Sequence, residues 1–138
     1  MVDPMLGEMI GEETGKITGT RVLPSEGGAP KVESSVHLAG RLLGIEVTNI
    51  ATFWGVMRPD GTLFVEGQGV VMANDGGTAT LIGQGSGRFT ASGGVSYRGA
   101  IYGESATGSL ARLNSMIIPF EAEADADQNI SWRFWEWK

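Results

Sequence analysis

Apolar and polar residues alternate in short runs along most of the chain, and glycine-rich sequences separate the runs. A period of two is typical of a β-strand with one buried face. No long run shows the 3.6-residue period and the caps of a helix. About eight strands are therefore expected, at 16–23, 31–39, 45–58, 62–73, 78–90, 95–105, 110–124 and 129–138.

The sequences between the runs are those of tight β-turns. Proline fits the second position of a type I turn, and glycine supplies the positive φ that a following position needs. Strands joined in this way form an antiparallel meander, which closes most economically as a barrel. We expect an all-β fold, a single antiparallel meander β-barrel at 14–138 that follows an N-terminal arm at 1–13. The turns lie at 58–62, 74–77, 91–94 and 106–109.

The turn type also predicts which residues share a face of the sheet. If each turn is a type I turn followed by a glycine bulge, even-numbered residues of the five runs from 45 to 124 share one face. The odd face is apolar with glycine gaps, and the even face mixes apolar groups with charged and polar ones. Two interpretations stay open. The odd face forms the core and the even face is solvated, or the even face lines a lumen and the odd face packs against other subunits.

The even face supplies the candidate site. In the expected register Glu66 lies opposite Trp54 and Gln84, and a carboxyl group beside tryptophan in a dry lumen would have a raised pKa, which suits a general acid or base. Tyr102 is the second candidate for proton transfer. The alternative role for Glu66 is a structural partner of Arg98 or Arg88. The candidate ligand-binding residues are Trp54, Arg58, Gln68, Gln84, Arg88, Arg98, Arg112 and Asn114.

Composition and charge exclude several classes of function. The chain has 138 residues, a net charge of −6, no cysteine and one histidine, His37. Its lysines and arginines form no cluster, so we expect no nucleic-acid partner. The ligand inventory is too poor for a transition-metal site, and no phosphate-binding loop is present, so no metal and no cofactor is expected. The first residues lack the pattern of a secretion signal and no stretch is apolar enough to span a membrane, which predicts a cytoplasmic protein.

Several segments carry a resemblance to a known family: RPDGTLFVEGQGV at 58–70, GQGSGRF at 83–89, SYRGAIY at 96–102 and WEWK at 135–138. They resemble a family of small uncharacterised bacterial proteins that is similar to the allene oxide cyclase-like, calycin-type β-barrels. The resemblance implies an eight-stranded barrel, often oligomeric, with an apolar lumen. Related barrels include cyclases that fold a flexible substrate without a cofactor. No cyclase catalytic residue falls on a matching motif in this chain.

Three functions are consistent with these observations. The first is binding of a small, mainly apolar molecule with one polar end in the lumen. The second is a cofactor-free isomerase or cyclase that acts on a flexible, natural-product-like substrate, and it needs the same pocket, so the sequence does not decide whether the protein is an enzyme. The third is a structural protein with a solid core. A homodimer or homotrimer is expected, because large apolar groups occupy both strand faces, including Trp132, Phe134, Trp135 and Trp137.

Overall fold

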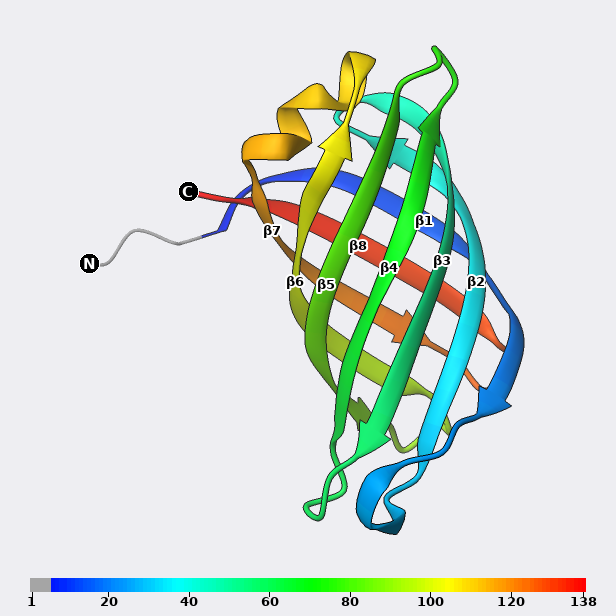
Figure 1. The fold of residues 1–138 in the computed structure, drawn as a ribbon. Coiled ribbons are helices and arrows are strands. Elements are labelled where there is room, and N and C mark those ends of the chain that lie inside the picture. The colour runs from blue at the N-terminus through cyan, green and yellow to red at the C-terminus, as the bar shows by residue number, and fades with distance from the viewer. Residues whose placement is uncertain (1–5) are drawn as a thin grey trace.

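A computed structural model describes residues 6–138 and shows a closed antiparallel barrel in which each strand pairs with the next and the last pairs with the first (Figure 1). This confirms the expected all-β meander barrel of eight strands. Two 3₁₀ segments, η1 (Glu26–Gly28) and η2 (Gly108–Ser115), lie between strands. The strands are β1 (Leu6–Val22), β2 (Lys31–Leu42), β3 (Ile45–Met57), β4 (Leu63–Ala73), β5 (Thr78–Phe89), β6 (Val95–Ala106), β7 (Ile117–Ala124) and β8 (Asn129–Trp137).

Two element boundaries differ from the expectation. Residues 6–13, assigned from the sequence to an arm, belong to β1, and residues 11–13 of that stretch pair with both β2 and β8. Residues 1–5 of the expected arm lie outside the described residues. The strand expected over 110–124 begins only at Ile117, because the chain first forms η2. Asn114 holds η2 in place, since its side chain bonds both the N–H and the C=O of Ala106 at 2.9 Å.

The odd residues of β4, β5 and β6 point into the barrel. Val65, Val71, Leu81 and Ile101 are all buried, whereas the even residues between them face outward. This confirms the first interpretation of the two faces and overturns the one in which the even face lines the lumen. The rule does not extend past η2, because β7 and β8 turn their even residues inward, as with Phe120.

Aromatic rings from several strands meet inside the barrel. The Phe53 ring packs edge-on against Tyr97 at 5.7 Å and against Trp132 at 6.5 Å, and Phe120 lies 5.0 Å from Trp132. The glycine gaps of the odd face make room for these rings. A Cβ atom on Gly99, for example, would come within 2.9 Å of Cε2 in the Phe120 ring. Large groups on one part of the wall therefore fill space that glycines leave on another.

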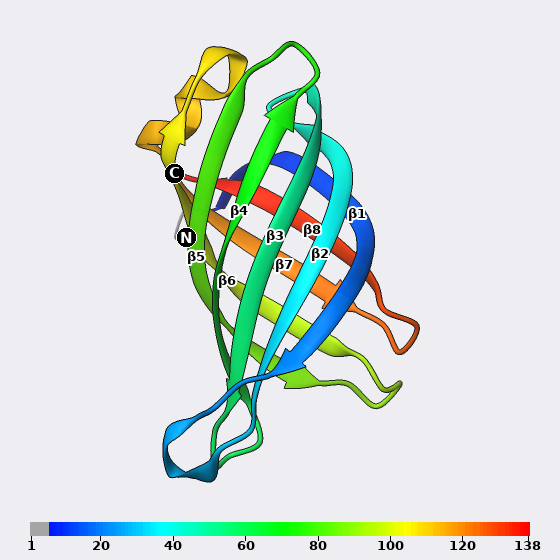
Figure 2. The ribbon, with the colours of Figure 1, turned by 45° about the vertical axis from the view of Figure 1, so that its right-hand side comes forward.

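The barrel has two unlike ends. Figures 1 and 2 show η2 and the β4–β5 turn at one end, and η1 with the β3–β4 turn at the other. At the first end, η2 packs against β5 and β6 and buries Leu110 and Leu113 completely. Side chains of η2 thus extend the core at that end.

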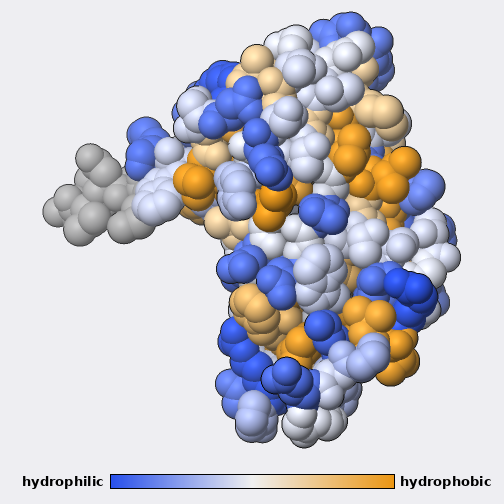
Figure 3. Space-filling view, in the orientation of Figure 1, coloured by the Kyte–Doolittle hydropathy of each residue, from blue (hydrophilic) through white to orange (hydrophobic). Residues whose placement is uncertain are grey.

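The outer wall is mixed in polarity. On β6, β7 and β8 the arginines and acids alternate across the strands: Arg98 pairs with Glu121, and Glu121 accepts a further bond from Arg133 at 3.3 Å. Exposed apolar groups are scattered among polar ones on the face shown in Figure 3. The exposed large apolar residues of β3 to β5 are Ile50, Val70, Met72 and Phe89.

Candidate functional site

A polar pair lies inside the apolar barrel. Asn49 on β3 donates a hydrogen bond from Nδ2 to Glu13 Oε1 on β1 at 2.9 Å, and only 1% of Glu13 and 6% of Asn49 are exposed. The strand between them is β2, whose residue paired with Glu13 is Gly40. Because Gly40 has no side chain, nothing from β2 at this position stands between the side chains of Glu13 and Asn49.

Three polar atoms of this region are buried without a hydrogen-bond partner: Glu13 Oε2, Asn49 Oδ1 and Trp132 Nε1. Trp132 is the residue of β8 that pairs with Glu13. A buried polar atom left unpaired costs about 1–3 kcal/mol, and such atoms are few in folded proteins. Their concentration around Glu13 marks this part of the lumen as a site with unmet hydrogen-bonding capacity.

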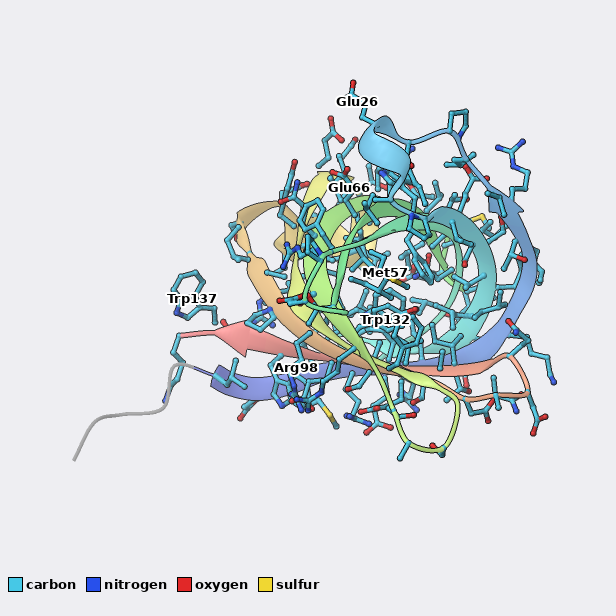
Figure 4. The ribbon with its side chains drawn as sticks, turned by 90° about the horizontal axis from the view of Figure 1, so that it is seen from below. Glu26, Met57, Glu66, Arg98, Trp132 and Trp137 are labelled. Atoms are coloured by element: carbon cyan, nitrogen blue, oxygen red, sulfur yellow. The ribbon has the colours of Figure 1, made fainter. Side chains whose placement is uncertain are left out.

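A cavity of about 60 Å³ lies beside these groups. Asn49 and Trp132 both border it, whereas Glu13 does not. The rest of its side-chain lining is mostly apolar, including Phe53, Leu81 and Ile101. In the view along the barrel in Figure 4, Trp132 and Met57 lie within the ring of strands, whereas Trp137 lies outside it. The cavity is therefore an apolar space with one polar corner.

The electrostatics of the lumen follow from burial. Desolvation raises the pKa of Glu13 from 4.5 to about 7, although the hydrogen bond from Asn49 acts in the opposite direction. Burial also raises the pKa of Tyr97 to about 12, so its hydroxyl stays neutral. No lysine, arginine or histidine is buried in the part of the chain that the structure describes. Glu13 is thus the one interior group of that part whose charge changes near neutral pH.

The candidate catalytic residues from the sequence lie elsewhere. Glu66 pairs with Trp54 and Gln84 as the expected register required, and it accepts hydrogen bonds from Trp54 Nε1 at 3.0 Å and Gln84 Nε2 at 3.5 Å. This trio sits on the outer wall, so the interpretation that places Glu66 in a lumen is wrong. Tyr102 is 44% exposed on β6. The dry surroundings invoked for general acid–base chemistry are absent at both residues.

The other candidate ligand-binding residues are spread over the outside of the molecule. The guanidinium of Arg58 lies 5.2 Å from the Phe64 ring centre, and Arg98 pairs with Glu121. Arg112 and Asn114 lie on η2 and not on a strand, and Arg112 reaches Glu136 at 3.4 Å.

Gln68, Gln84 and Arg88 are exposed. Gln68 and Gln84 border the cavity, as Glu66 does, through the backbone, since their side chains alternate outward. Among all the predicted site residues, the structure joins only Trp54, Glu66 and Gln84 into one hydrogen-bonded group.

Sequence reasoning missed the interior polar group. Glu13 was assigned to the arm, although it alternates with Gly11, Gly15 and Ile17, all of which lie on the inward side of β1. An acid placed among such residues is itself a signal of a buried carboxyl group. Asn49 carries a similar signal, because its neighbours two positions away on β3 are apolar.

The described residues contain no group of three or more His, Cys, Asp or Glu side chains arranged to hold a metal ion. Within residues 6–138, no helix has both the length and the apolar character needed to cross a membrane.

Comparison with known proteins shows the fold alone. No protein-family model and no curated protein matches the chain. A protein of unknown function from Clostridium acetobutylicum ATCC 824 superposes with a TM-score of 0.80 at 10% identity, over 95% of this chain and 98% of that one. A conserved protein of unknown function from Rhodopseudomonas palustris gives a TM-score of 0.80 at 12% identity, over 97% and 99%. These likenesses support the eight-stranded barrel, and they do not extend to the cyclase-like family.

Proposed function

We propose that the barrel binds a small molecule in its lumen, with the polar end of the ligand beside Asn49 and Trp132. The observation that carries this proposal is an apolar cavity bordered by Asn49 and Trp132, each of which keeps one buried polar atom without a hydrogen-bond partner. A ligand that bonds these atoms would offset the cost of burying them. Its carbon part would lie against Phe53 and Ile101, as in other barrel sites where a few polar groups orient an apolar ligand.

The cavity limits the size of the buried part of the ligand. A dry cavity of about 150 Å³ holds benzene, and this one measures about 60 Å³. The buried part is therefore smaller than a benzene ring. The best small ligands gain at most about 1.5 kcal/mol per non-hydrogen atom, so a ligand with about four such atoms binds no tighter than tens of micromolar.

The same volume weighs against the cyclase alternative. A flexible natural-product-like substrate needs a pocket of roughly 300 Å³ or more, and aromatic rings occupy that space here. The structural alternative, a barrel whose interior is filled by its own side chains, is favoured by the same packing. If no small molecule enters the lumen, this structural role is the remaining alternative.

Nuclear magnetic resonance of ¹⁵N-labelled protein tests the proposal. The probes are three-carbon compounds of different charge, namely n-propanol, n-propylammonium and propionate. Binding in the lumen predicts a saturable shift of the Trp132 indole N–H and the Asn49 amide with at least one probe. The Trp54 indole N–H, which bonds Glu66 on the outer wall, is the matched control and should not move. The proposal fails if no probe saturates, or if Trp54 responds as strongly as Trp132.

A further inference from the structure

We propose that two copies of this chain pack face to face through the outer wall formed by β2, β3, β4 and β5. The proposal concerns the outside of the barrel and does not depend on a ligand in the lumen. Three features of this wall carry it: its middle has no charged side chain, its area matches that of a protein interface, and its two ends carry charges that complement each other in a two-fold dimer.

The middle of the wall is a grid of nine outward residues, which we call the outer patch. It consists of the even-numbered residues of 48–52 on β3, 68–72 on β4 and 78–82 on β5, and the central row joins Ile50, Val70 and Thr80. None of the nine is charged. Three of its apolar members are largely exposed, namely Ile50 at 49%, Val70 at 46% and Met72 at 43%.

Elsewhere the outer wall is strongly charged. One row across β6, β7, β8, β1, β2 and β3 alternates in sign, because each residue pairs with an opposite charge on the next strand. Its members are Arg98, Glu121, Arg133, Glu12, Arg41 and Glu46. The outer patch breaks this pattern. An exposed apolar area with charges only around it is typical of a surface that contacts another protein.

The wall is large enough for a stable dimer. In Figures 1 and 2, β2, β3, β4 and β5 run side by side, and β3 has 13 residues. With strands about 4.8 Å apart and about 3.3 Å per residue, these four strands cover roughly 800 Å². A standard protein interface buries about 800 Å² on each partner. A second copy that covers this wall therefore buries the area that a specific complex needs.

The charges at the two ends of the wall identify a second copy as the occupant. Arg41 on β2 and Glu46 on β3 lie at one end, whereas Glu33 on β2 lies towards the other end, where Arg58 directly follows β3. A two-fold axis that crosses these strands lays each strand over its own copy in the reverse direction. Glu46 then meets the partner's Arg58, and Arg41 meets the partner's Glu33. Neither Glu46 nor Arg58 belongs to an ion pair among residues 6–138. The wall is thus self-complementary, as a two-fold dimer requires.

Sedimentation velocity of the full chain tests the proposal. Interfaces of this size associate at micromolar concentrations or below, so we expect a dimer at about 10 µM protein. Val70→Glu places a negative charge in the middle of both facing patches and should weaken the dimer about 100-fold. Val22→Glu is the matched control, because it makes the same change at a residue that is 84% exposed at the end of β1. It should leave the association unchanged.

A charge exchange tests the two-fold arrangement. Glu46→Arg sets two positive charges against each other across the interface and should weaken the dimer about tenfold. Adding Arg58→Glu should restore the wild-type affinity. Residues 46 and 58 lie at opposite ends of β3, so the restored attraction arises between copies and not within one.

Each outcome decides for or against the proposal. A monomer at about 100 µM protein would overturn it and would leave a different protein as the occupant of the outer patch. A dimer that Val70→Glu does not weaken would place the interface elsewhere and also overturn it. Should Val70→Glu not fold, the charge exchange decides, and a double variant that associates no better than Glu46→Arg alone would show that the proposal is wrong.

Discussion

Asn49 and Glu13 are joined by a 2.9 Å hydrogen bond that crosses the lumen side of β2, between strands that do not pair with each other. The bond joins Asn49 Nδ2 to Glu13 Oε1, and it leaves the other oxygen of Glu13, Oε2, and the amide oxygen of Asn49, Oδ1, without a partner. The barrel thus buries a carboxyl group that is only half satisfied. Its ionisation should be visible in the stability of the fold.

Glu13 should make the protein less stable as the pH rises from about 4.5 to about 7. In this window the unfolded chain releases the proton while the folded protein keeps it, because burial raises the pKa of Glu13 to about 7. The free energy of unfolding should therefore fall with rising pH by about 3 kcal/mol in total. Glu13→Gln removes this contribution, so its advantage over wild type should grow across the window. Urea unfolding at several pH values measures the free energy of unfolding of both proteins. If this free energy changed with pH in the same way for wild type and Glu13→Gln, the account would be contradicted.

Two glycines of β1 should respond differently to alanine. A Cβ atom on Gly15 would lie 1.9 Å from the backbone oxygen of His37, whereas a Cβ on Gly19 meets nothing within 4 Å. Gly15→Ala forces β1 and β2 apart and should cost about 1–3 kcal/mol of stability. Gly19→Ala should stay within about 0.5 kcal/mol of wild type. Thermal or urea unfolding of the pair checks this, and equal stabilities would show that the strands are not so closely packed.

Adjacent residues of η2 should also differ. Leu113 is fully buried, and Leu113→Ala should destabilise the barrel by about 2–5 kcal/mol. Arg112 is exposed and reaches only Glu136 at 3.4 Å, so Arg112→Ala should change stability by less than about 1 kcal/mol. Denaturant unfolding of both variants provides the comparison. A small effect of Leu113→Ala would mean that η2 does not belong to the core.

Glu66 is predicted to be nearly neutral for stability. It lies on the outer wall with Trp54 and Gln84, where water can replace the lost hydrogen bonds. Glu66→Leu and Glu66→Gln should each shift the free energy of unfolding by less than about 0.5 kcal/mol. A loss on the order of 3 kcal/mol for Glu66→Leu would indicate a buried charged partner after all.

The fold could be predicted because its signals are local. Turn residues such as Asp60 and Gly61 stand next to the strands they join, and the same turns gave the register that places Glu66 opposite Trp54 and Gln84. The inward face could not be decided in this way, since large apolar residues occupy both faces. What decides it is non-local: rings such as Phe120 fill the space over glycines of other strands, such as Gly99.

The site was missed for related reasons. An acidic N-terminal stretch looks like a mobile arm until β8 is seen to pair with it, which places Glu13 beside Trp132. Two of the four aromatic residues from which an oligomer was expected, Trp132 and Phe134, stack on each other within the barrel. Trp137 faces outward and is 53% exposed, and the expected oligomer stays a prediction.

The titration of the Glu13 side chain tests the account most directly. The ¹³C shift of its carboxyl carbon, followed by nuclear magnetic resonance as the pH is changed, reports the proton itself. We predict a midpoint near pH 7, because burial disfavours the charged form of the carboxyl group. A midpoint near 4.5 would contradict a carboxyl group that is buried inside the barrel with only one hydrogen-bond partner.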